Sequence, residues 1–247
     1  MEKKILPIVM SIFLLSGCSS STATSTETAT LPSPTETTAP TPTPTEGLLV
    51  FGPTIEVPQG TAPTIDGILS RGEWDRAFTD ELSDGSELMM MHSNGYLYLG
   101  IRSRVMSVGS ICTLKNEQVW ILHSSAALGN AVYEKTDGGW HQIEGFSWCC
   151  RATTPNLERD DFLKENGWMA SIAFMGISNE MEYQIAMEDG TLTLAVTSIF
   201  NRFTIPYWPQ TLEDDCRLYE VADGAPPESV QFDIDAWVTV LAAPTSE

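Results

Sequence analysis

Two apolar runs joined by an Asn-Gly pair constrain the fold of this chain more than any other feature. The runs Leu88–His92 and Tyr96–Arg102 flank Asn94-Gly95, and Asn-Gly supplies the positive φ angles that a two-residue type I′ hairpin turn requires. Similar short runs, alternating or continuously apolar, follow along the chain and are separated by Gly, Pro, Asn and Asp. This pattern predicts an all-β fold, an antiparallel β-sandwich.

One helix is expected within this β-rich chain. Residues Leu157–Asn166 follow Pro155 and Asn156, and acidic side chains lie near the expected helix start, where the helix dipole favours them. The expected strands cover residues 54–57, 87–92, 96–103, 119–123, 131–135, 141–145, 169–175, 181–187, 192–199 and 229–240.

The N-terminus is typical of an export signal. Lys3 and Lys4 precede an apolar run, Ile5–Leu15, which is too short to span a bilayer because a membrane helix needs about 20 residues. The sequence Leu-Ser-Gly-Cys at Leu15–Cys18 resembles the lipobox of bacterial lipoproteins, which implies cleavage before Cys18 and lipid attachment to it. The alternative is an ordinary secretory signal followed by a chance cysteine. We expect an extracytoplasmic protein held on the bacterial cell envelope by the lipid at Cys18.

The segment after the signal cannot form a hydrophobic core, because Ser, Thr and Pro account for 21 of the 28 residues at positions 19–46. The run Ala39–Thr45, in which Pro and Thr alternate after the alanine, favours polyproline II. We therefore expect three parts. They are a lipoprotein signal peptide at residues 1–17, lipidated Cys18 with a disordered stalk at residues 18–46, and a β-sandwich domain at residues 47–247.

The charge balance excludes one class of partner. The chain has 13 Lys plus Arg against 33 Asp plus Glu, a formal net charge of −20. So acidic a surface repels phosphate backbones, and we expect no nucleic-acid partner. The membrane is expected to be contacted through the lipid anchor only.

The beginning of the expected domain resembles a known family. Thr64–Ile68 reads Thr-Ile-Asp-Gly-Ile, Gly72–Trp74 follows it, and Leu97–Ile101 reads Leu-Tyr-Leu-Gly-Ile. These motifs resemble the opening of family 9 carbohydrate-binding modules and their DOMON-like relatives, and Glu182–Ile185 and Tyr207–Pro209 resemble the second half of that fold. The resemblance implies a jelly-roll sandwich.

The function that we expect is non-catalytic binding of an extracellular glycan or cell-surface polysaccharide. One alternative is a structural or protein-interaction sandwich without a sugar site. A third reading is a haem-binding, DOMON-like electron-transfer domain. The motifs Gly-x-Ser-x-Gly, His-Glu-x-x-His and the phosphate-binding P-loop are absent from the sequence, so no enzymatic activity is expected.

Three tryptophans are candidates for sugar stacking, because Gly, Ser, His or Pro flanks each in an expected loop, where aromatics often serve recognition. The alternative is that they cover the open end of the sandwich. Trp140 and Trp148 flank the short strand 141–145, which brings them to one end of the sandwich or leaves them at opposite ends. The candidate ligand-binding residues are Trp140, Trp148, Trp208, Gln142, Glu144 and Asn201, whereas Trp74, Trp120 and Trp237 are expected in the core.

The string His123–Gly129 is also distinctive, because a strand runs there into small residues and Gly. It has two readings: a binding turn whose backbone approaches a ligand, or a tightly packed connection between strands.

No cofactor is expected. Some DOMON-like relatives hold haem through Met and His, but core filling explains the run Met89–Met91 more simply. The histidines that the haem reading would use are His92, His123 and His141. A structural Ca²⁺ ion would need several oxygens converging from loops. Such oxygens are offered by three acidic groups, at Asp80, Glu81, Asp84 and Glu87, at Glu158, Asp160 and Asp161, and at Glu213, Asp214 and Asp215.

Four cysteines remain when Cys18 is set aside, an even number in an oxidising compartment. Cys149 and Cys150 are adjacent, and neighbouring Cα atoms lie about 3.8 Å apart, below the usual range for a disulfide. We therefore expect one of them to pair with Cys112 and the other with Cys216, without distinguishing which.

Overall fold

The computed structural model describes residues 50–151, 157–173 and 178–244. The expected signal peptide, Cys18 and the stalk lie outside the described residues. Strands dominate the described part of the chain, as the all-β prediction requires. The strands are β1 (Thr54–Val57), β2 (Phe78–Glu81), β3 (Glu87–Ser93), β4 (Tyr96–Lys115), β5 (Gln118–Ser124), β6 (Ala127–Thr136), β7 (Gly139–Arg151), β8 (Trp168–Ile172), β9 (Ser178–Ala186), β10 (Thr191–Ile199), β11 (Tyr207–Trp208), β12 (Ser229–Val230) and β13 (Val238–Ala242). The helices are α1 (Leu157–Asn166), the 3₁₀ helix η2 (Asp215–Arg217), α2 (Tyr219–Ala222) and the 3₁₀ helix η3 (Ile234–Ala236).

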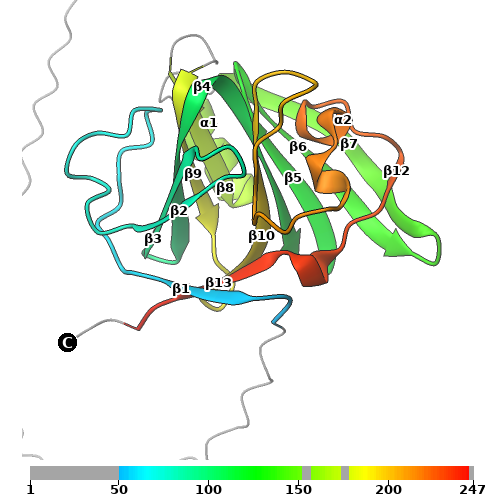
Figure 1. Cartoon of the computed structure of the whole chain (residues 1–247), viewed down its shortest axis with the longest axis horizontal. Helices are drawn as coiled ribbons and strands as arrows, with labels where there is room; N and C mark the ends of the chain where they lie inside the picture. Colours follow the sequence, from blue (N-terminus) through cyan, green and yellow to red (C-terminus); the bar gives the residue numbers. More distant parts are fainter. Residues whose placement is uncertain (1–49, 152–156, 174–177, 245–247) are drawn as a thin grey trace, which may run out of the picture. The chain divides into compact units, whose positions relative to one another are not determined.

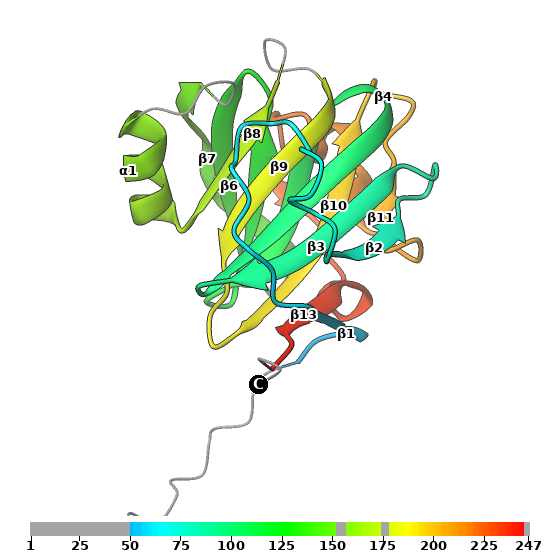
Figure 2. The same ribbon diagram turned by 90° about the vertical axis from the view of Figure 1, so that its left-hand side faces the viewer.

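Strand β4 belongs to two groups of strands. Its N-terminal part, up to Arg102, pairs with β3 and β9, whereas its C-terminal part, from Val108, pairs with β10 and β5. The β9 group runs in the order β2-β3-β4-β9-β8, and the β5 group runs β1-β13-β10-β4-β5-β6-β7-β12, with β11 beside β10. Figure 2 shows the β9 group nearest the viewer and β6, β7 and β10 behind it.

The hairpin between β3 and β4 confirms the Asn-Gly prediction. Ser93 pairs with Tyr96, and Asn94 and Gly95 both have positive φ angles, 51° and 79°, as a type I′ turn requires. Helix α1 also has its expected bounds. Strand β4 continues to Lys115, well beyond its expected end at residue 103, because its second half finds new partners in β5 and β10.

The C-terminal segment differs from the single strand expected at residues 229–240. It forms β12 and β13 with η3 between them, and β13 pairs in parallel with β1 at the foot of the domain in Figure 1. The sheet is therefore mixed, which corrects the purely antiparallel expectation. The carboxylate of Asp214 stabilises the segment between β12 and β13. It accepts hydrogen bonds from the Asp233 N–H at 2.9 Å and from Trp237 Nε1 at 2.6 Å.

The main hydrophobic core lies between the β9 group and one face of the β5 group. Because side chains alternate along a strand, Leu194 and Val196 of β10 point into this core while Ala195 points to the opposite face. A second core covers that opposite face. It contains residues that follow β11 in the sequence, namely Leu212, Cys216, Val221, Val230, Phe232 and Trp237. Trp74 is buried as expected, whereas Trp120 is half-buried against the main core.

The disulfides differ from the expected pairing. Cys112 bonds to Cys216, with Cα atoms 6.3 Å apart, and Cys149 bonds to its neighbour Cys150. All four cysteines are thus paired, but Cys149 and Cys150 do not reach the other two. The reason is that Cys112 on β4 faces the second core, where the segment carrying Cys216 lies, whereas the other two cysteines lie at the end of β7.

The Thr64–Ile68 string forms a turn on a buried carboxylate. Glu182 Oε2 accepts hydrogen bonds from the N–H groups of Asp66 and Gly67 at 2.9 and 2.8 Å. Burial raises the pKa of Glu182 to about 7, although these two hydrogen bonds oppose the shift. Within this structure the string fastens the chain onto β9.

Candidate functional site

Trp148 is the exposed member of the three candidate tryptophans. It lies on β7 and is 49% exposed. Its ring stacks on that of Phe146, with ring centroids 5.1 Å apart and an angle of 21° between the planes. We call these two rings the aromatic shelf.

Glycine backbone approaches the shelf from two sides. A Cβ atom on Gly129 of β6 would lie 2.7 Å from the Trp148 ring and 2.9 Å from the Phe146 ring. A Cβ atom on Gly224 would lie 2.9 Å from Trp148 as well. The Trp148 ring is therefore seated closely against two backbone segments, although half of the side chain remains in solvent.

His123 supports the shelf from within the protein. Its ring is buried and meets the rings of Phe146 and Trp148 edge to face, with centroids 5.8 and 5.6 Å away. Its Nδ1 lies 2.8 Å from the carbonyl oxygen of Ala222 and, since a carbonyl only accepts, Nδ1 carries the proton. Burial lowers the pKa of His123 to about 4, so the ring is neutral at neutral pH. The shelf thus rests on an uncharged, fixed support.

An exposed aromatic ring that is fixed in place can stack on the apolar face of a ligand without a large loss of side-chain entropy. Sugar rings present such faces through their C–H groups. Glu144, exposed two residues before Phe146, is a hydrogen-bond acceptor on the strand that carries the shelf. Within the shelf, stacking is the interaction that the geometry offers.

Trp140 and Trp208 offer no open ring face. Trp140 is only 3% exposed, packs against Phe232 and donates a hydrogen bond from Nε1 to the Phe232 carbonyl at 3.1 Å. Trp208, also 3% exposed, donates from Nε1 to Asp80 Oδ2 at 2.9 Å. Both side chains belong to the hydrophobic cores, which corrects their placement in binding loops.

Trp140 and Trp148 do not form a clamp. They lie at opposite ends of β7, since Trp140 pairs with Lys135 and Trp148 with Gly129 on β6. Eight residues of strand separate them by roughly 25 Å. The sequence left open whether the two tryptophans share one end of the sandwich or lie at opposite ends, and in the structure they lie at opposite ends of β7.

The polar candidates are scattered. Gln142 is half-buried on β7, where its N–H bonds to the Glu228 carbonyl. The side chain of Asn201 lies beyond β10 and accepts a hydrogen bond from the Phe203 N–H at 2.8 Å. Of Gln142, Glu144 and Asn201, only the first two share a strand with the shelf.

The sequence reasoning missed Phe146, Gly129 and Gly224 as parts of the site. A signal for one of them lay in the His123–Gly129 string, which supplies both His123 and Gly129 to the shelf. The string is a tight connection between β5 and β6, in which the Ser125 N–H bonds to the Ala127 carbonyl. The contact between β7 and Gly224 joins residues far apart in sequence, and local patterns carry no signal for it.

The Met and His candidates of the haem reading are dispersed. Met89, Met90 and Met91 are all buried in the main core. His92 Nε2 lies 3.1 Å from the Ala243 carbonyl oxygen, and His141 is exposed on β7. Filling of the core accounts for the Met run.

The acidic groups make structural contacts. Glu87 forms an ion pair with Arg102, Asp161 with Lys164, and Asp214 caps η2 through the Cys216 N–H. Across the described ranges, no three His, Cys, Asp or Glu side chains are grouped so as to hold a metal ion. Among the same residues, no helix has the length and apolar character needed to cross a membrane.

Comparison with known proteins gives no match to a family model, to a curated protein or to a solved structure.

Proposed function

We propose that this chain is a lipid-anchored, extracytoplasmic glycan-binding protein without catalytic activity. Its folded part is a jelly-roll β-sandwich of the kind found in family 9 carbohydrate-binding modules, and its ligand stacks on the aromatic shelf. The observation that carries the proposal is Trp148, a half-exposed tryptophan that is seated against Gly129 and Gly224.

The energetics support a binding role for that ring. Burial of the aromatic ring stabilises the fold at Trp140 and Trp208, whereas Trp148 leaves about half of its surface in water and lacks much of this stabilisation. Close seating against glycine backbone fixes the ring before a ligand arrives, and such preorganisation lowers the entropic cost of binding. A ring that served packing alone would gain stability by being covered.

The anchor gives this binding role its setting. The signal at residues 1–17 directs export and is cleaved before Cys18, and the lipid on Cys18 then holds the protein on the outer side of a bacterial membrane. The Ser/Thr/Pro stalk to residue 46 links this lipid to the domain. A glycan of the cell envelope or of the surroundings is then within reach. In the alternative, a protein-interaction sandwich, the exposed Trp148 ring would contact a polypeptide instead of a glycan.

The test is a glycan array probed with the full-length protein and with a Trp148→Ala variant. Wild type should retain a defined set of glycans, and the variant should bind them more weakly by ~1 to 3 kcal/mol, the scale of a lost aromatic anchor. Phe200→Ala is the matched control, because Phe200 is also 49% exposed but lies outside the shelf. Equal glycan binding by wild type and Trp148→Ala, or no glycan binding by wild type, would overturn the proposal.

A further inference from the structure

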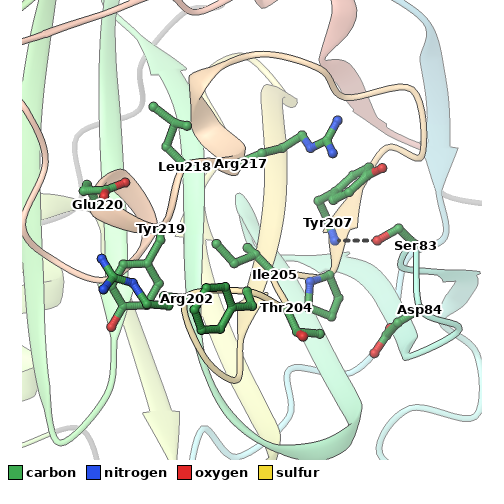
Figure 3. A pocket seen from close by; sticks show the side chains of 12 residues that line it. Ser83, Asp84, Arg202, Thr204, Ile205, Tyr207, Arg217, Leu218, Tyr219 and Glu220 are labelled. Carbon is green, nitrogen blue, oxygen red and sulfur yellow. Dashed lines mark hydrogen bonds between the residues drawn. The ribbon is translucent and has the colours of Figure 1, made fainter.

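A surface depression that shares no residue with the aromatic shelf is the second candidate site. It has a volume of about 520 Å³, within the range of small-ligand sites, and is open to solvent. Figure 3 shows that it is lined from three sides: the segment between β10 and β11, the segment of η2 and α2, and the turn between β2 and β3. We call it the arginine cleft after Arg202 and Arg217, which lie in its lining.

Each arginine of the cleft pairs with a tyrosine ring. The Arg217 guanidinium carbon lies 4.0 Å from the centroid of the Tyr207 ring, and that of Arg202 lies 5.7 Å from the centroid of Tyr219. Arg217 Nη1 also donates to the Leu212 carbonyl at 2.7 Å. Aromatic faces and this carbonyl orient the planar guanidinium groups without neutralising them.

Neither guanidinium forms an ion pair with a carboxylate in the part of the chain that the structure describes. This is unexpected in a chain with 33 acidic and only 13 basic residues other than His. Arg102, by comparison, pairs with both Glu87 and Glu180. Two arginines without carboxylate partners in one depression keep N–H donors for a ligand.

The other groups of the cleft suit a polyhydroxylated ring. Asp84 and Glu220 line it with carboxylate acceptors, and the Ser83 hydroxyl accepts a hydrogen bond from the Tyr207 N–H at 3.2 Å. Phe203 is 90% exposed and follows Arg202 directly. An anion alone would meet repulsion from the two carboxylates, whereas a sugar acid offers hydroxyl donors to them as well.

We propose that the arginine cleft binds an acidic saccharide, with Arg202 and Arg217 holding its carboxylate or sulfate groups and the acidic side chains accepting from its hydroxyls. Guanidinium groups match both kinds of anion in a bidentate geometry. The net negative charge of the protein opposes long-range attraction, but at physiological salt the screening length is only about 8 Å, so contacts within the cleft decide binding. No lining residue of the cleft belongs to the aromatic shelf, and this proposal does not rest on the function proposed for the shelf.

The test is calorimetric titration of the full-length protein with three probes: trigalacturonate, its neutral methyl ester, and a sulfated galactose trisaccharide. Trigalacturonate or the sulfated probe should bind and identify the anion, and the neutral ester should bind more weakly by about tenfold or more. Arg202→Ala and Arg217→Ala should each weaken that binding by about tenfold. Arg202 is exposed, so its variant is expected to fold even if Arg217→Ala does not.

Two controls separate this site from other effects. Arg71→Ala removes an exposed arginine outside the cleft, and it should leave binding of the acidic probe unchanged. Trp148→Ala should also leave it unchanged, so a failure here is distinct from a failure of the shelf. Absence of binding by both acidic probes, equal binding of the neutral ester, or full binding by Arg202→Ala would each overturn the proposal.

Discussion

Gly129 lies against the ring of Trp148 so closely that a methyl group on it would stand 2.7 Å from a ring carbon. The backbone of β6 therefore sets the position of the aromatic shelf. A substitution on one strand is expected to change binding through a side chain on the next.

Gly129→Ala should displace the rings of Trp148 and Phe146 and weaken glycan binding. The measurement is the affinity of the variant for the glycans that wild type selects, with Trp fluorescence as a readout of the ring's surroundings. Gly145→Ala is the matched control, because its nearest neighbour would be a Gln142 side-chain atom at 3.6 Å, an ordinary contact. Unaltered affinity in Gly129→Ala would show that the close approach of Gly129 does not position the Trp148 ring.

Trp140→Ala and Trp148→Ala should differ in stability. Trp140 is buried and its indole N–H is bonded, so truncation should lower the free energy of unfolding by about 3 to 5 kcal/mol. Truncation of half-exposed Trp148 should cost less. Urea unfolding of both variants measures the difference, and equal losses would mark Trp148 as a core residue.

The bond between Cys112 and Cys216 should contribute strongly to stability. It closes a loop with a sequence separation of 104, which the chain-entropy model values at about 4 to 5 kcal/mol. The double variant Cys112→Ala/Cys216→Ala should therefore unfold at a lower denaturant concentration. Peptide mapping without reduction should recover Cys112 linked to Cys216, and a peptide linking Cys112 to Cys149 or Cys150 would contradict the structure.

The carboxyl of Glu182 should make stability depend on pH. Its pKa rises from 4.5 to about 7 on folding, so its contribution is fully present below pH 4.5 and is lost as pH rises through 7. The loss is up to roughly 3 kcal/mol. Asp66 and Glu73 add to the upward shift, whereas the guanidinium of Arg159 interacts favourably with the ionised carboxylate and limits the loss.

Glu182→Gln separates this effect from other titrations. The amide oxygen can still accept from the Asp66 and Gly67 N–H groups, but the side chain does not ionise. Urea unfolding from pH 4.5 to 7.5 should show a decline in wild type that is reduced in the variant. Parallel pH profiles for the two proteins would exclude Glu182 as the titrating group.

The lipid anchor makes a cellular prediction. Cys18→Ser should move the protein from the membrane fraction to a soluble or unprocessed pool, because the lipid is expected on that side chain. Labelled fatty acid should enter wild type and not the variant. Wild-type protein that never takes up the label would contradict the anchor.

Local patterns predicted the parts of the fold that local chemistry determines. The Asn94-Gly95 turn and helix α1 depend on a few consecutive residues, and both lie where the sequence placed them. The second half of β4, the parallel pairing of β13 and the partner of Cys112 depend on segments far away in the chain. No periodicity encodes such partners.

In the two candidate sites, too, the sequence did not predict the features that depend on distant segments of the chain. The flanking residues of Trp140 and Trp148 are equally loop-like in sequence, yet Phe232, some 90 residues further on, buries only the former. The arginine cleft likewise brings together Ser83, Arg202 and Arg217. These residues come from separate segments of the chain, so local sequence patterns carry no signal for the cleft.

Hydroxyl-radical footprinting with mass spectrometry tests the central claim most directly. The full-length protein is oxidised with and without the glycan that the array selects, and the modification of Trp148 is compared with that of Phe200, which has the same exposed fraction. The glycan should protect Trp148 and leave Phe200 unchanged. Equal oxidation of Trp148 in the presence and absence of bound glycan would contradict the assignment of the aromatic shelf as the binding site.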